Sequence, residues 1–473
     1  MDTLERIASE RVAALARVHD LSREFLRGLD ERPVGAVAPF EDLVGALGGP
    51  LPERGTEPVV IVEQLAAAVE PGLMASAGPR YFGFVIGGSL PAALAADWLT
   101  SAWDQNAGLA ATSPAANAVE AVVAEWLKDL AGLPRDADVG FVTGCQMANF
   151  TGLVAARHSV LARAGWDVEE DGLQGAPAVN VLIGEEAHAT ILSALRMLGF
   201  GTRRAIRVAA DAQGRMRTDA LKAALATLRG PTIVCAQAGN VNTGAFDPLD
   251  EIAALTRSHG AWLHVDGAFG LWAAAAPSRR HLVRGLQDAD SWATDAHKWL
   301  NVPYDSGIAF VRERGLMVQA LHKSAAYLVR MGGARDGADY TPDASRRARG
   351  FALWAGLRSL GKDGVAELVE RCCALATRLA DRLRQGGARL LNEVVLNQVL
   401  VRFEPRGGGD GDALTRAVTA RIQREGVCWA SGTRWRGQEA LRLSVSNWST
   451  RERDVDRSAD AILAALRAEE AGR

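Results

Sequence analysis

Short apolar runs that alternate with helical stretches fill the middle of this chain, and they constrain its fold more than any other feature. Between about residues 115 and 312, runs rich in Val, Ile and Ala predict strands at 139–143, 179–183, 204–208, 232–237, 261–265, 291–294 and 307–311, with helical stretches between most of them. Strands that are apolar throughout and separated by helices are typical of a mostly parallel sheet covered on both faces. The sequence therefore predicts an α/β fold with a seven-stranded sheet.

The two ends of the chain follow different patterns. Residues 3–29 have the apolar spacing of an amphipathic helix, and a Pro- and Gly-rich stretch follows at 33–58. Beyond about residue 350, the pattern predicts helices at 349–360, 364–385, 412–424 and 451–468, and strands at 394–403 and 440–446. We therefore expect an N-terminal helical segment (1–78), a large domain (79–350) and a small C-terminal α+β domain (351–473).

Composition and charge exclude several classes of protein. The 473 residues are 48% hydrophobic, which is enough for two or three lobes with buried cores. The net charge of −3 does not favour nucleic-acid binding, and no apolar run approaches the roughly 18 residues that span a bilayer. The charged N-terminus is unlike a signal peptide, and the five cysteines fit no zinc pattern. We expect a cytoplasmic protein that binds no membrane and no metal.

Lysine is scarce in this chain, and one of its five lysines has an unusual setting. Lys298, preceded by His297, follows the strand predicted at 291–294. Ligands of open parallel sheets bind beyond the carboxyl ends of the strands, so this amine stands where chemistry takes place. A lysine amine is a nucleophile only when it is deprotonated, which a dry or cationic site promotes. The alternative interpretation is a lysine in solvent.

A carboxylate occupies the corresponding place on another predicted strand. Asp266 follows the apolar strand at 261–265 and stands 32 residues before Lys298. An aspartate there can pair with the protonated ring nitrogen of a pyridine cofactor, and the small residues Gly267 and Ala268 let a flat ring approach. An aspartate after a strand is more often a turn or cap residue. The combination with Lys298, in this order, is what favours a cofactor.

Two further turns lead from a strand into a helix. One turn passes through Gly144, so the first N–H groups of the next helix, at Cys145 and Gln146, form an anion site suited to a phosphate. Many such turns look alike, and this one is informative only beside the others. His188 follows the strand at 179–183 and opens a helix, where its ring can stack on a planar cofactor or simply lie in solvent.

Taken in order, these segments resemble the fold-type I enzymes that use pyridoxal 5′-phosphate (PLP), and more narrowly the group II amino-acid decarboxylases. The resemblance runs from about Pro79 to Leu360, and its most specific motif is His297-Lys298-Trp299-Leu300. Two other stretches are similar to family segments: Pro79-Arg80-Tyr81-Phe82-Gly83-Phe84, and Thr112-Ser113-Pro114-Ala115 followed by Glu120. The resemblance implies the fold of the PLP-dependent transferases, with its mostly parallel sheet in the large domain.

The resemblance also implies a role for each matching residue. Lys298 would carry PLP as a Schiff base, Asp266 would hold the ring nitrogen, and Ala268 and His188 would lie beneath and above the ring. The phosphate would be bound by Gly144, Cys145 and Gln146, with His297 close to phosphate and substrate. Asn240 and Thr243, in the turn from Gly239 to Gly244, would lie near the cofactor.

Three positions depart from the family pattern. The family usually carries Ser or Thr where Gln146 stands, so phosphate contacts would rely more on the backbone. Asp295 replaces a frequent Asn, and because a carboxylate repels a phosphate, we expect Asp295 to point elsewhere. Asp-Gly-Ala-Phe at 266–269 differs from the Asp-Ala-Ala-Tyr of aromatic decarboxylases, which weakens the case for an aromatic substrate.

The reaction depends on residues beyond the PLP site. PLP labilises whichever bond stands perpendicular to its ring, and the resulting carbanion must then be protonated at Cα. The segment Ser324 to Leu328 resembles a mobile family loop whose tyrosine, supplied by the partner subunit, is that acid; here it is Tyr327, although a packing tyrosine is the alternative. Decarboxylation of an L-amino acid by a homodimer with a shared active site is therefore implied. An aminotransferase, an aldehyde synthase, a C–C bond-forming enzyme and a non-catalytic PLP-binding protein are the alternatives.

Arginines after the loop complete the candidates. Those in the stretch from Ser345 to Gly350 are interpreted as structural, through loop anchoring and ion pairs. Arg442 is a candidate for recognising a substrate carboxylate, or else it pairs with a neighbouring helix. Phe84 and Trp103 are candidates to line the pocket, but the substrate is not readable from the sequence.

Overall fold

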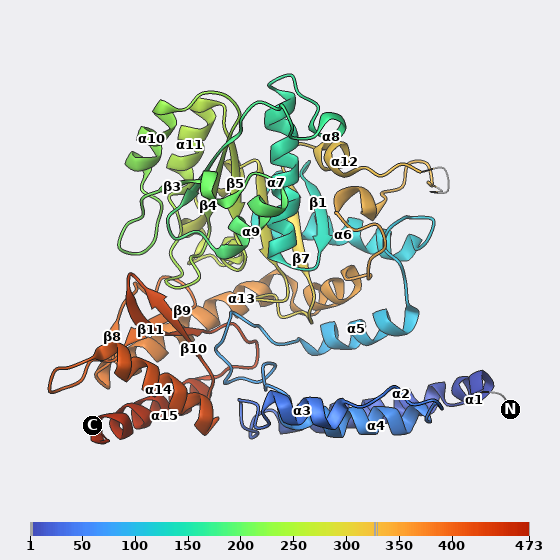
Figure 1. The fold of residues 1–473 in the computed structure, drawn as a ribbon, viewed down its shortest axis with the longest axis vertical. Helices are drawn as coiled ribbons and strands as arrows, with labels where there is room; N and C mark the ends of the chain where they lie inside the picture. The colour runs from blue at the N-terminus through green and yellow to red at the C-terminus, as the bar shows by residue number, and fades with distance from the viewer. Residues whose placement is uncertain (1–2, 326–327, 329, 473) are drawn as a thin grey trace.

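The central sheet of the protein has seven strands in the order β1-β7-β6-β5-β4-β2-β3 (Figure 1). This computed structural model describes residues 3–325, 328 and 330–472. The strands are β1 (Asp138–Val142), β2 (Asn180–Gly184), β3 (Ile206–Val208), β4 (Thr232–Gln237), β5 (Trp262–Asp266), β6 (Ser291–Asp295) and β7 (Gly307–Val311). Neighbours from β3 to β6 pair in parallel, whereas β7 is antiparallel to both β6 and β1. The predicted mostly parallel, seven-stranded sheet is confirmed.

Two hydrophobic cores lie on opposite faces of this sheet. Leu182 and Val234 belong to one core, and their neighbours Ile183 and Cys235 belong to the other. Because successive strand residues point to opposite faces, only a continuous apolar run can bury both. One face is covered by α7 (Cys145–Ala162), α9 (Ala189–Met197) and α12 (Leu316–Leu321), and the other by α6 (Pro114–Ala131), α10 (Thr218–Thr227), α11 (Leu249–His259) and the first part of α13 (Gly350–Gln385). The short helix α8 (Val168–Asp171) follows α7.

A second, smaller sheet is formed by the C-terminal part of the chain. Its strands pair antiparallel in the order β10 (Ser431–Trp435), β11 (Gln438–Ser444), β9 (Gln398–Arg402) and β8 (Arg389–Leu390). It packs with α13, α14 (Gly411–Glu425) and α15 (Glu452–Ala471). Helix α13 is interrupted at Gly361, where φ is 64°, so the two helices predicted at 349–360 and 364–385 meet there end to end.

The N-terminal helices form a layer of their own beside the rest of the molecule (Figure 1). They are α1 (Thr3–Ser9), α2 (Arg11–Gly28), α3 (Phe40–Leu47) and α4 (Pro58–Val69), and α5 (Pro91–Trp103) leads from them towards the large sheet. None of the described residues of α2, α3 or α4 is buried. Their exposed apolar side chains include Leu15, Leu26, Phe40, Val44, Ile61 and Leu65. Among all described residues, no helix is long and apolar enough to cross a membrane.

Candidate active site

Lys298 and Asp266 come together at the carboxyl edge of the large sheet. Asp266 is the last residue of β5, and Lys298 follows the end of β6, which is the parallel neighbour of β5. The amine Nζ of Lys298 lies 3.1 Å from Oδ2 of Asp295, and the lysine side chain is only 18% exposed. Burial lowers the pKa of Lys298, but the negative charges of Asp295 and Asp266 outweigh it and raise the pKa above its usual value.

The carboxylate of Asp266 is fixed by three donors, none of which is a cation. Oδ2 accepts from Nδ2 of Asn149 over 3.2 Å, while Oδ1 accepts from the thiol of Cys145 over 3.4 Å and from the N–H of Ala268 over 3.2 Å. Asp266 is 3% exposed, and among the described residues no cationic side chain lies within ion-pair distance of it. A buried carboxylate of this kind is suited to a protonated ring nitrogen.

A chain of hydrogen bonds that the sequence analysis missed orients Asp266. Trp262 Nε1 donates to the hydroxyl of Ser291 over 2.9 Å, and that hydroxyl lies 2.8 Å from Nδ1 of His264. Nε2 of His264 lies 2.9 Å from Oδ1 of Asn149. Because Asn149 uses its amide nitrogen on Asp266, its oxygen must accept, which places the single proton of His264 on Nε2. Burial lowers the pKa of His264 to about 4, so the ring is neutral at pH 7. The spacing of four residues between Cys145 and Asn149 places both on one face of a helix, and this was the sequence signal that could have predicted their shared contact with Asp266.

Asp295 does not point away from the phosphate-binding turn, and our expectation for it is wrong. Its Oδ1 accepts the backbone N–H of Cys145 over 2.6 Å and lies 3.4 Å from Nε2 of His297. The N-terminus of α7 offers N–H groups that have no partner within the helix, and Lys298 adds a positive charge. These groups attract the Asp295 carboxylate rather than repel it.

The remaining parts of the phosphate-binding turn differ in what they contribute. Gly144 has an extended φ of 178°, which any residue can adopt, so the backbone conformation of the turn does not require a glycine at this position. A Cβ added there would lie 3.2 Å from Cε1 of His297 and 3.5 Å from Oδ1 of Asp295, so the glycine allows a close approach. Gln146 is exposed, which leaves the backbone N–H groups of α7 as the anion-binding feature at this turn.

His188 and Asp266 line the same cavity, together with Gly184, Ala187 and Gln237. His188 is half-buried at the start of α9, where its Nδ1 accepts the N–H of Thr190 over 3.3 Å. The interpretation of His188 as a solvent-exposed residue is therefore excluded, and burial lowers its pKa. The imidazole and the carboxylate therefore face one and the same cavity.

Asn240 and Thr243 hold the turn that follows β4. Oδ1 of Asn240 accepts the N–H groups of Asn242 and Thr243 over 2.9 and 3.2 Å, and its Nδ2 donates to Gln237. The hydroxyl of Thr243 donates to the carbonyl of Gln213 over 2.7 Å. These bonds shape the loop beside the cavity, and a contact of either residue with the cofactor stays a prediction.

His297 has a partner that the sequence analysis did not identify. The ring of Tyr304 stacks on its imidazole, with 4.1 Å between the ring centroids and 25° between the planes. Nδ1 of His297 accepts the N–H of Ser306 over 3.1 Å, which fixes the orientation of the ring. Tyr327, the predicted proton donor, lies outside the described residues.

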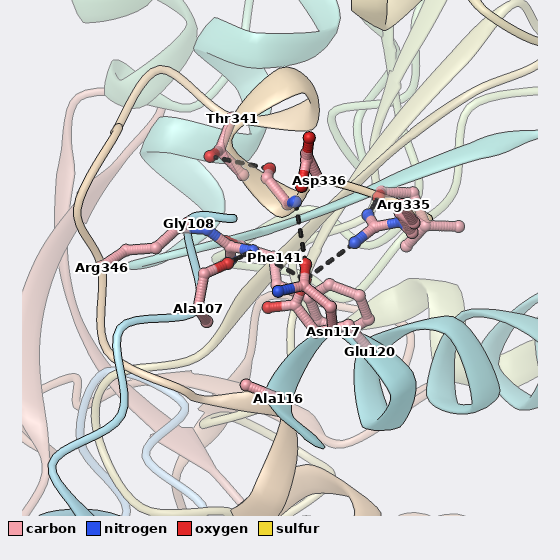
Figure 2. Close-up of polar contacts among 12 residues, drawn as sticks. Ala107, Gly108, Ala116, Asn117, Glu120, Phe141, Arg335, Asp336, Thr341 and Arg346 are labelled. Carbon is pink, nitrogen blue, oxygen red and sulfur yellow. Dashed lines mark hydrogen bonds and ion pairs between the residues drawn. The ribbon is translucent and has the colours of Figure 1, made fainter. Parts of the chain in front are cut away.

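Buried Glu120 pairs with two arginines of the segment after the predicted loop, and one of these arginines also contacts β1, the strand that leads into this site. Figure 2 shows its carboxylate facing Arg335 and Arg346, with N···O distances of 2.8 and 2.7 Å. Arg346 also donates to the carbonyl of Phe141 in β1 over 3.1 Å, three residues before the phosphate-binding turn begins. The interpretation of Arg346 as a structural residue agrees with these contacts.

The residues at this edge of the sheet fit PLP. The largely buried amine of Lys298 suits the aldehyde of this cofactor, and the buried carboxylate of Asp266, which has no cationic partner among the described residues, suits its ring nitrogen. The cavity lined by the imidazole of His188 suits the face of the ring, and the N-terminus of α7 suits the phosphate. When bound, PLP acts as an electron sink for a bond to the substrate Cα. The fold and the site together define a fold-type I PLP-dependent enzyme.

Comparisons with known proteins narrow this class. Residues 47–404 match the family model described as the pyridoxal-dependent decarboxylase conserved domain. The chain is 29% identical over 425 residues to tryptophan decarboxylase 1 of Oryza sativa subsp. japonica, covering 84% of this chain and 82% of that protein. It is also 29% identical to L-2,4-diaminobutyrate decarboxylase of Rhizobium meliloti strain 1021, over 98% of this chain and 90% of that one. The crystal structure of Oryza sativa TDC with PLP and tryptamine superposes with a TM-score of 0.90 at 25% identity, covering 98% of each chain.

The chain belongs to the pyridoxal-dependent decarboxylase family. It is a PLP-dependent enzyme that decarboxylates an amino acid, as the resemblance implied.

Proposed function

We propose that this enzyme removes the α-carboxyl group of an L-amino acid with PLP that is covalently attached to Lys298 between turnovers. The observation that carries the proposal is the largely buried Lys298 amine, which pairs with the Asp295 carboxylate and feels the charge of Asp266, at the ends of adjacent parallel strands. In this proposal Asp266 holds the ring nitrogen, and His188 covers the ring. The first N–H groups of α7 bind the phosphate.

Arg442 is our candidate for binding a carboxylate of the substrate. It is 8% exposed on β11, and the only hydrogen bond of its side chain among the described residues runs from Nη1 to the carbonyl of Val241 over 3.4 Å. Its Nε is buried without a partner there, and no acidic side chain in the described part of the chain forms an ion pair with it. Burial lowers the pKa of Arg442, and a carboxylate would compensate for this desolvation.

We further propose that the enzyme works as a homodimer in the cytoplasm. The exposed apolar side chains of α2, α3 and α4 form a surface that a second copy of the chain would bury. The family resemblance implies that Tyr327 reaches the site of the partner subunit and protonates Cα there. All five cysteines are free and buried, which is typical of a reducing compartment.

Substitution of Lys298 and Tyr327 tests this proposal directly. With PLP and a panel of L-amino acids, we expect Lys298→Ala to lose the visible absorbance of the attached cofactor and all amine formation. We expect Tyr327→Phe to keep that absorbance and to shift the product from amine towards aldehyde. Lys222→Ala, which changes an exposed lysine on α10, is the matched control. Amine formation that survives in Lys298→Ala would refute the proposal, and an unchanged product and rate in Tyr327→Phe would remove that residue from it.

A further inference from the structure

The carboxylate of Asp295 lies where the proposed function requires a phosphate. Its Oδ1 accepts the N–H of Cys145, which is the first residue of α7. Asp295 is only 2% exposed, so bulk water does not screen it. A cofactor phosphate that binds the first N–H groups of α7 would therefore meet a buried group of the same charge. Two anions so placed need a proton or a cation between them.

The nearest cation does not stay available for this purpose. Nζ of Lys298 lies 3.1 Å from Oδ2 of Asp295 and balances its charge in this structure. The proposed function commits this amine to the aldehyde of PLP. Attachment of the cofactor therefore brings a phosphate to Asp295, and the Lys298 nitrogen that now pairs with Asp295 becomes bonded to the aldehyde carbon of the cofactor.

His297 cannot supply the missing proton either. Its Nδ1 accepts the N–H of Ser306 over 3.1 Å, and its Nε2 faces Oδ1 of Asp295 at 3.4 Å. The ring proton of neutral His297 is therefore on Nε2, and a second proton on Nδ1 would break the bond from Ser306. Burial lowers the pKa of His297, which acts in the same direction.

The other titratable groups around Asp295 are committed as well. The thiol of Cys145 donates to Asp266, and burial raises its pKa well above the usual value. The carboxylate of Asp266 accepts three hydrogen bonds from the protein, and in the proposed function it also binds the ring nitrogen. Burial lowers the pKa of His188 and raises that of Tyr304, so both stay neutral near pH 7. Asp295 and the phosphate itself, whose second pKa is about 6, are the remaining groups that can hold a proton between them.

We propose that binding of the cofactor phosphate beside Asp295 draws one proton from solvent, which the Asp295 carboxylate and a phosphate oxygen then share in one O–H···O hydrogen bond. The N–H of Cys145 passes from Asp295 to the phosphate in the same step. This inference rests on the proposed function, which puts a phosphate at the N-terminus of α7. Its consequence is that the affinity for PLP falls as the pH rises, because the proton must be recruited from solvent.

The test counts the protons that are bound with the cofactor. PLP and pyridoxal, which has the aldehyde but no phosphate, are titrated into the wild-type and Asp295→Asn apoenzymes by calorimetry in two buffers of different ionisation enthalpy. Above pH 7.5 free PLP is a dianion at its phosphate, whose second pKa is about 6. We expect wild-type protein to take up about one more proton with PLP than with pyridoxal, and Asp295→Asn to show no such difference. The wild-type PLP dissociation constant should rise about tenfold more per pH unit than that of the variant.

Each outcome decides between the two proposals. Equal proton uptake with PLP and pyridoxal in wild-type protein overturns the role of Asp295, and this comparison does not depend on the variant folding. If the wild-type and Asp295→Asn proteins take up equal numbers of protons with PLP, the role of Asp295 is overturned too. The proposed function still stands in that case, provided that absorbance shows PLP attached to Lys298. PLP that does not attach to Lys298 at all overturns both. Asp288→Asn, an exposed aspartate 3.4 Å from Arg257, is the matched control and should behave as wild type.

Discussion

Single buried side chains hold the charges of this site in place, and His264 is the clearest example. Its neutral ring is hydrogen-bonded to Ser291 on one side and to Asn149 on the other, and Asn149 in turn donates to Asp266 and fixes that carboxylate. A neutral buried histidine makes stability depend on pH, because the unfolded chain binds a proton that the folded protein cannot accept. The pKa of His264 is lowered from 6.5 to about 4, so its contribution to stability is complete above pH 6.5 and is lost as the pH falls towards 4.

We expect this residue to reduce the free energy of unfolding by about 2 kcal/mol between pH 7.5 and pH 5. Asp247 acts in the opposite direction, because burial raises its pKa to about 6 and its contribution is lost as the pH rises through 3.8 to 6. Urea unfolding of wild-type and His264→Gln proteins, at equal PLP concentration, isolates the histidine, since Asp247 contributes to both. The same pH dependence in the two proteins would contradict this account.

At the scale of elements, Glu120 joins α6 to the segment 335–346, which lies more than 200 residues further along the chain. From α6 it pairs with Arg335 and Arg346, and Asn117 on the same helix accepts the N–H of Gly337 over 2.9 Å (Figure 2). The side chains of Glu120 and Arg346 are each 1% exposed. Removing one charge from a buried pair leaves the other without compensation, which is strongly destabilising.

We expect Glu120→Gln to lower the free energy of unfolding by about 3 kcal/mol. Glu125→Gln on the same helix is the control, because Glu125 is 66% exposed beside Lys128 and its loss should change stability by less than about 1 kcal/mol. Denaturant unfolding of both variants measures the difference. Equal stabilities would show that the buried pair does not hold these segments together.

At the scale of the whole molecule, the N-terminal layer is the surface through which we propose that two copies of the chain associate. Ile61 and Leu65 stand four residues apart on α4 and are 47% and 53% exposed in the single chain. In the proposed dimer these apolar side chains are covered. The division of the chain at residues 78 and 350 stays a prediction, although the strands of the two sheets fall on either side of residue 350.

We expect the double substitution Ile61→Glu and Leu65→Glu to weaken the dimer by roughly 100-fold or more, because two charges would be buried in an apolar contact. Met197→Glu is the control, since Met197 on α9 is 49% exposed and lies outside the layer. Sedimentation velocity over a range of concentrations reads out the association state. A double variant that remains dimeric like the control would place the interface elsewhere.

Local pattern in the sequence was sufficient for the sheet and for the main chemical groups. Apolar runs specify strands because both faces of a parallel sheet are buried, and the break at Gly361 is visible as a gap between two helical patterns. Lys298 and Asp266 could be placed together because each follows a strand, and parallel neighbours end at the same edge.

Tertiary structure alone decided the direction and partners of the side chains. Asp295 accepts the N–H of Cys145, 150 residues away in the sequence, and Asn149 meets His264 across 115 residues. Such contacts depend on how helices pack on the sheet and on which buried polar groups still need partners, and neither is a property of a local stretch of sequence.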